Sequence, residues 1–145
     1  MILSTLLLLV AAPGNCPEAG EAELSSECYL QYLQERFPDV DCEEATTQLE
    51  MNVCSGSDFA RADIALNEAW SRVRERYRNP DGTGEAWNAI LKAQRAWLAY
   101  RDADCDVEKI RWRGGSIMPL MVSSCLAGLT EARTSKLECL ATEGC

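Results

Sequence analysis

The chain has 145 residues, a formal net charge of −9, eight cysteines and no histidine. A chain of this length predicts one domain with room for a short appendage. The absence of histidine excludes catalytic triads and dyads built on imidazole, and the acidic balance excludes a nucleic-acid binder that neutralises phosphates with a basic surface. We therefore expect no enzyme, no cofactor and no metal, and a basic protein is the partner that this charge would attract.

Residues 1–14 have the composition of a signal peptide. An uncharged, apolar run ends at Ala12 and is followed by Pro13 and Gly14. The run is shorter than the roughly 20 apolar residues that cross a bilayer, so no membrane span is expected. Asn15 is a poor match to the small residue that lipoprotein processing prefers before a cysteine, which argues against a lipid on Cys16. The sequence therefore predicts a periplasmic or secreted protein.

Residues 15–40 form an acidic extension ahead of a domain predicted at 41–145. Between Cys16 and Asp58 eleven acidic residues accompany the single basic residue Arg36. Apolar residues at helical spacing predict a helix from Glu18 to Phe37, which Pro38 ends.

Helical periodicity continues through the rest of the chain. A short helix is expected over 46–54, ending near Ser55-Gly56, and Ser57 is the expected N-cap of a longer helix that ends at the turn 79–82. Further helices are expected over 85–110 and 119–140, separated by a break at 113–116. The fold class is therefore all-α, a small antiparallel helical bundle stapled by disulfides. Its expected core includes Trp70, Trp87 and Trp97.

The eight cysteines behind an export signal indicate a disulfide framework. Cys105 and Cys125 each lie ten residues from Gly115, so a helical hairpin centred there brings them level. Cys42 can reach Cys54 only if the chain folds back, because twelve residues of continuous helix span about 18 Å. The competing pair, Cys54 with Cys105, is level across the turn 79–82. We favour pairs 42–54 and 105–125, with local pairing of Cys16 and Cys28. Cys139 and Cys145 then pair with each other or exchange partners with that first pair.

Several short sequence motifs from position 41 onward occur in a characteristic order. The most diagnostic block runs from Ala93 to Cys105 and contains Gln94-Arg95-Ala96-Trp97-Leu98. It is preceded by Asp41-Cys42, Thr47-Gln48, Met51-Asn52, Cys54, Ala62-Asp63 and Leu66-Asn67, and followed by Gly114-Gly115-Ser116-Ile117, Pro119, Cys125-Leu126, Leu129-Thr130, Arg133 and Leu137. Over about residues 41–140 the chain resembles the LprI-type lysozyme-inhibitor family of bacterial envelope proteins. The resemblance implies an exported, disulfide-bonded helical domain and, as its function, inhibition of lysozyme.

Polar residues on or beside the apolar helix faces are candidates for a structural network. Buried polar groups need hydrogen-bond partners, so these side chains are expected to fix the register of the helices, in preference to acid–base work by Asp63 and Asp102. The alternating carboxylates Asp102, Asp104 and Asp106 are expected to be a solvated face, because they lack the glycine turn of a cation site. The predicted network contains Asp63, Asn67, Gln94, Arg101 and Asp102.

The loop between the last two predicted helices is the best candidate for binding a partner. It holds a Gly-Gly pair beside an aromatic residue and two arginines, whose side chains suit the cleft carboxylates of a basic lysozyme. An interaction with another envelope protein, without lysozyme inhibition, is the alternative function. The candidate residues are Arg111, Trp112, Arg113, Gly114, Gly115, Ser116 and Ile117.

Overall fold

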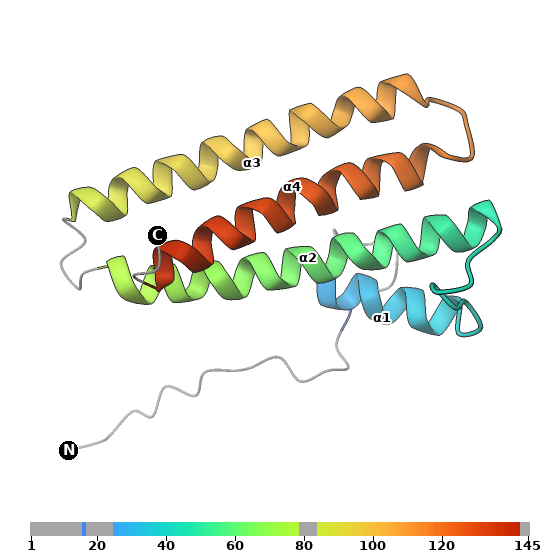
Figure 1. The fold of residues 1–145 in the computed structure, drawn as a ribbon, viewed down its shortest axis with the longest axis horizontal. Helices are drawn as coiled ribbons and strands as arrows, with labels where there is room; N and C mark the ends of the chain where they lie inside the picture. The colour runs from blue at the N-terminus through green and yellow to red at the C-terminus, as the bar shows by residue number, and fades with distance from the viewer. Residues whose placement is uncertain (1–15, 17–24, 79–83, 143–145) are drawn as a thin grey trace, which may run out of the picture.

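The computed structural model describes residue 16 and residues 25–78 and 84–142, and it contains four α-helices there (Figure 1). They are α1 (Ser26–Arg36), α2 (Gln48–Tyr77), α3 (Glu85–Arg111) and α4 (Met118–Ala141). No strand occurs among these residues. The predicted fold class, an all-α bundle stapled by disulfides, is confirmed. The predicted signal peptide at 1–14 lies outside the described residues.

The helices are arranged with α4 in the middle. Figure 1 shows α3 along one edge, α4 beside it, then α2, with α1 against α2. Helices that follow one another from α2 onward run in opposite directions, so α2 and α4 run in the same direction. α4 therefore separates α3 from most of α2.

The hydrophobic core lies mainly between α2 and α4. Leu66, Ala69 and Val73 of α2 meet Leu137 of α4, and all four are almost completely buried. Two of the expected core tryptophans, Trp70 and Trp97, pack against this cluster. Trp87 stacks on Trp70 with ring centroids 5.4 Å apart.

The predicted break at 55–57 is wrong. α2 continues through these positions as one helix of 30 residues, and Ser55, Gly56 and Ser57 are buried within it. Ser55 donates its hydroxyl hydrogen to the Asn52 carbonyl 3.1 Å away, which satisfies this buried polar group inside the helix. The helix begins instead after Thr47, where Thr47 and Glu50 form a capping box. Backbone N–H groups of Thr47 and Thr46 donate to the Glu50 carboxylate and lower its pKa.

Gly56 serves close packing between helices. A Cβ at this position would lie 2.8 Å from the Tyr29 hydroxyl oxygen of α1. Burial raises the pKa of the Tyr29 phenol, since the charged form would lose its hydration. The sequence signal that suggested a helix end therefore marks the place where α1 rests on α2.

A matched pair of glycine substitutions tests this role. Gly56→Ala is expected to lower the free energy of unfolding by up to about 2 kcal/mol, because overpacking against Tyr29 outweighs the roughly 1 kcal/mol gained in helix propensity. Gly128→Ala is the control, since a Cβ there meets nothing within 4 Å in the middle of α4. It should raise the free energy by about 1 kcal/mol. Urea unfolding followed by circular dichroism measures both, and equal effects at the two sites would contradict this role for Gly56.

α1 is also shorter than predicted. It begins after Ser25, whose backbone is extended and whose side-chain oxygen accepts a hydrogen bond from the Cys28 N–H, and it ends at Arg36. The predicted helix began at Glu18, and residues 17–24 lie outside the described residues.

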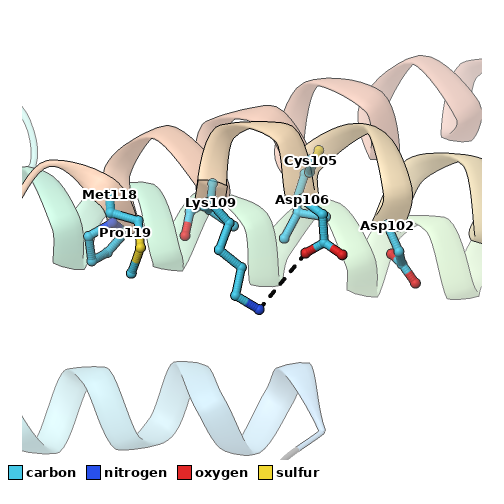
Figure 2. A pocket seen from close by; sticks show the side chains of 9 residues that line it. Asp102, Cys105, Asp106, Lys109, Met118 and Pro119 are labelled. Atoms are coloured by element: carbon cyan, nitrogen blue, oxygen red, sulfur yellow. Dashed lines mark ion pairs between the residues drawn. The ribbon is translucent and has the colours of Figure 1, made fainter. Parts of the chain in front are cut away.

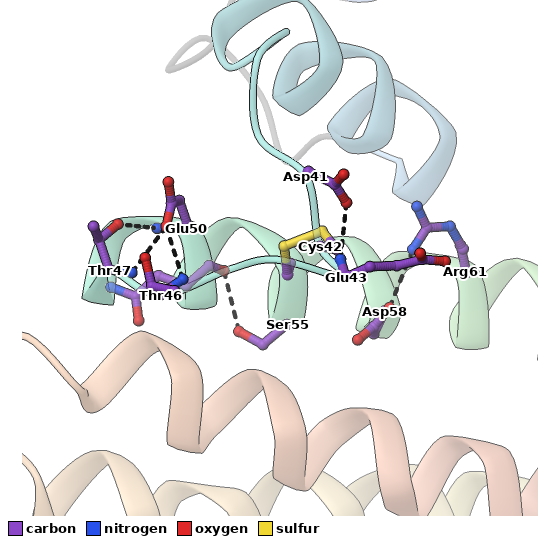
Figure 3. The surroundings of a disulfide bond; sticks show 11 residues. Asp41, Cys42, Glu43, Thr46, Thr47, Glu50, Ser55, Asp58 and Arg61 are labelled. Carbon is purple, nitrogen blue, oxygen red and sulfur yellow. Dashed lines mark hydrogen bonds and ion pairs between the residues drawn. A yellow bond between two sulfur atoms is a disulfide. The ribbon is translucent and has the colours of Figure 1, made fainter.

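Disulfides fix the chain where the helices meet. The chain folds back ahead of α2, so Cys42 lies against Cys54 with a Cα–Cα distance of 5.6 Å (Figure 3). Cys16 bonds Cys28, and Cys105 bonds Cys125. The competing pair of Cys54 with Cys105 is absent, because α4 lies between their helices. Cys139 is disulfide-bonded, and its expected partner Cys145 lies outside the described residues.

Candidate functional site

The α3–α4 hairpin carries the predicted partner-binding loop at its tip. Arg111 ends α3, with Trp112 as its C-cap, and Met118 begins α4, so the intervening turn is short. Gly115 donates its N–H to the Trp112 carbonyl at 3.0 Å, and Met118 donates to the Gly115 carbonyl at 3.1 Å. Gly114 has a φ of 80°, a left-handed conformation that glycine adopts without steric cost. The Gly-Gly pair therefore gives the hairpin its tight reversal.

Two long-range links hold this loop in place. The Cys105–Cys125 disulfide joins the helices behind it, and Cys105 is almost completely buried. From α2, the Asn52 side-chain amide donates to the Ser116 carbonyl at 3.0 Å. The loop is therefore preorganised, so binding a partner would cost it little conformational entropy.

The side chains at the tip present positive charge beside an aromatic ring. Trp112 is half-buried and donates its indole N–H to Glu108 at 2.7 Å. The Arg111 guanidinium lies 5.4 Å from the Trp112 ring centroid and 3.7 Å from Glu108. Arg111 and Arg113 are both exposed. The tip can therefore offer two guanidinium groups to carboxylates of another protein.

A groove of 370 Å³ lies between α3 and α4 beside this tip (Figure 2). Its apolar wall comes from Met118, Pro119 and other residues of α4, and Asp102 and Asp106 lie along its α3 side. Lys109 forms an ion pair with Asp106 at 3.9 Å. Among the described residues, no three acidic or cysteine side chains are grouped so that they could hold a metal ion.

Arg101 is the centre of the polar contacts farther along the hairpin. Its side chain is 11% exposed and lies 3.6 Å from Asp63 of α2 and 2.8 Å from Asp102. Asp63 also accepts hydrogen bonds from Asn67 at 3.3 Å and from Ser26 of α1 at 2.8 Å. These contacts link α1, α2 and α3 across a single guanidinium group. They bring together four of the five predicted network residues.

Gln94, the fifth predicted network residue, lies apart from Arg101. It is buried and accepts a hydrogen bond from Arg133 of α4 at 2.9 Å. Burial lowers the pKa of the Arg133 guanidinium, which also lies 5.7 Å from the Trp97 ring centroid.

The sequence prediction missed Ser26, Arg133 and the Asn52 contact. Arg133 was detectable, because Arg133 and Trp97 are equally far from Gly115 and so are level in the hairpin. The Asn52–Ser116 contact joins positions 64 apart, and no local pattern marks it.

Comparison with known proteins gives this fold a family. The model of the family described as "Lysozyme inhibitor LprI" matches residues 41–137, about two thirds of the chain. The chain belongs to the LprI family. It is also similar to the uncharacterized protein R02472 of Rhizobium meliloti (strain 1021), with 38% identity over 109 residues that cover 70% of this chain and 78% of the relative. No solved structure matches the chain.

The match to the LprI family starts at Asp41 and therefore includes all of α2, α3 and the hairpin loop. α1 precedes it. Two of the three described disulfides, 42–54 and 105–125, fall inside the matched range. Among the residues that the structure describes, none of the helices is long and apolar enough to cross a membrane.

Proposed function

We propose that this chain is an exported inhibitor that binds a basic lysozyme-type muramidase through the hairpin tip, residues 111–117. Membership of the LprI family is the observation that carries the proposal. It is supported by the rigid tip, with two exposed arginines next to a half-buried tryptophan. Glycoside hydrolases of this type carry two carboxylates in the substrate cleft, which are suitable acceptors for guanidinium groups.

The charges of the two proteins would act at different stages of binding. The net charge of −9 would attract a basic enzyme over long distances and raise the association rate. The arginines at the tip would then give specificity, because their guanidinium groups can pair with the carboxylates of the cleft. This division predicts that salt weakens association while the tip decides which enzyme is inhibited.

The test is lysis of bacterial cell walls by a chicken-type and a goose-type lysozyme in the presence of the purified protein. Stoichiometric protein at micromolar concentration is expected to suppress the activity of at least one enzyme. Arg111→Ala/Arg113→Ala is expected to raise the inhibition constant by about 10- to 100-fold, since charge-paired groups at interfaces each contribute strongly to affinity.

The matched control removes two arginines at the far end of the molecule. Arg74→Ala/Arg78→Ala takes the same charge from exposed positions where α2 ends, and it should leave the inhibition constant within about threefold. Full lysozyme activity with the folded wild-type protein would overturn the proposal and favour a different envelope partner. Equal losses in the two double variants would overturn the role of the tip.

A further inference from the structure

The outer face of α3 carries a regular apolar stripe that no other part of the described chain covers. From Ala86 to Ile110, eight exposed apolar residues recur at alternating spacings of three and four. This is the spacing of a coiled-coil seam, in which two helices pack along their whole length. Figure 1 shows α3 at the edge of the molecule, with α4 on its other side. We call these eight residues the outer seam.

The outer seam is divided by side-chain size. Its first four positions, up to Ala96, are all alanine, whereas the last four include Tyr100, Val107 and Ile110. These three large residues are 55%, 58% and 63% exposed. Large apolar residues that lie exposed in one row mark an interaction surface, because binding of another surface would remove their apolar area from water.

The seam is complementary to itself in the antiparallel direction. Positions that are symmetric about residue 98 pair Ala86 with Ile110, Ala89 with Val107 and Ala96 with Tyr100. Each of these three layers joins one small and one large side chain, which fills the space evenly. The fourth layer joins Ala93 to Ala103, so two small side chains meet there. A parallel arrangement would instead set Tyr100 against Tyr100 and leave five layers of alanine facing alanine.

The charges along one flank of the seam have the same symmetry. Glu85, Lys92 and Arg95 lie on the first half of this flank, and Asp102, Asp106 and Lys109 on the second, all of them exposed. Antiparallel pairing sets Lys92 near Asp106 of the second copy, Arg95 near Asp102, and Glu85 near Lys109. Each of these contacts joins opposite charges, and each occurs twice in the dimer because of the twofold symmetry. Parallel pairing would instead set each charged residue beside the same residue of the second copy, so that like charges would meet.

We propose that two copies of this chain associate through their outer seams, with α3 antiparallel to α3 of the second copy. The proposal rests on the exposed heptad spacing, the size complementarity and the charge complementarity of this one helix. It does not depend on lysozyme binding. The α3 helices, each about 40 Å long at 1.5 Å per residue, would leave the two hairpin tips at opposite ends of the dimer.

Sedimentation equilibrium over micromolar to millimolar protein measures the association. The wild-type mass is expected to rise from monomer to dimer across this range. Ala96→Glu places two carboxylates near the symmetry axis and should keep the protein monomeric throughout. Ala132→Glu is the matched control, another exposed alanine, on α4, and should dimerise like the wild type. A wild-type protein that stays monomeric at millimolar concentration, or an A96E variant that dimerises normally, would overturn the proposal.

Charge substitutions test the direction of pairing. Lys92→Glu and Asp106→Lys each replace an attraction by a repulsion at two symmetric places, so each should raise the dimer dissociation constant by about tenfold. An equimolar mixture of the two variants should regain the wild-type constant, because a mixed dimer pairs opposite charges again. Dissociation constants that do not change in the single variants would exclude the antiparallel arrangement.

Discussion

Leu137→Ala is expected to lower the free energy of unfolding by about 2–5 kcal/mol, among the largest effects of any single substitution in this chain. Leu137 is completely buried where α4 meets Leu66, Ala69 and Val73 of α2. Truncation removes apolar contacts and leaves a cavity that these neighbours cannot fill, because helix backbones do not collapse by the width of a side chain. Urea unfolding with the disulfides intact measures the change.

Leu49→Ala is the matched control for Leu137. The same atoms are removed from a side chain that is 57% exposed in the first turn of α2. The expected change is within about 0.5 kcal/mol, as for most surface substitutions. A loss at Leu49 as large as that at Leu137 would contradict the assignment of the core to the interface of α2 with α4.

Removal of the hairpin disulfide is the second large effect. Cys105→Ala/Cys125→Ala should lower the free energy of unfolding by about 3 kcal/mol, since the bridge closes a loop across a sequence separation of 20 residues. Alanine is preferred to serine because Cys105 is 2% exposed, and a serine hydroxyl there would lack a partner. Replacing both cysteines avoids a free thiol that could exchange with the other bridges.

Hydrogen exchange locates the effect of this double variant. α3 packs mainly on α4, so loss of the bridge should accelerate exchange in α3 more than in the core residues of α2. Equal acceleration in both helices would mean that the bridge stabilises the bundle only as a whole. An unchanged free energy of unfolding would contradict the prediction itself.

The sequence predicted the elements whose signals are local. Apolar spacing placed α3 and α4 to within two residues, and the position of Cys105 and Cys125 about Gly115 predicted their bond. The error at Ser55-Gly56 has a specific cause. Small polar residues usually favour turns, but here the packing of Tyr29 requires a small residue inside a helix, and tertiary packing overrides local propensity.

The polar contacts were predicted less completely than the helices. Asp63 and Arg101 are roughly level across the turn that joins α2 to α3, so their ion pair follows from the same reasoning that aligned the cysteines. Gln94 was grouped with them because all three are polar residues on or beside apolar helix faces. In the structure, Arg133 of α4 donates a hydrogen bond to the side-chain oxygen of Gln94. Partner choice among buried polar groups depends on side-chain directions, which helical spacing alone does not determine.

The described disulfides have an order that matters for how the protein is made. The bridges 16–28, 42–54 and 105–125 each join two cysteines with no other cysteine between them. As the chain emerges from the ribosome or a translocation pore, the second cysteine of each bridge can therefore react with the free thiol that emerged just before it. These three bonds arise without rearranging any earlier one, so an oxidase that joins thiols in order of appearance suffices for them, and the slow step of reshuffling is avoided.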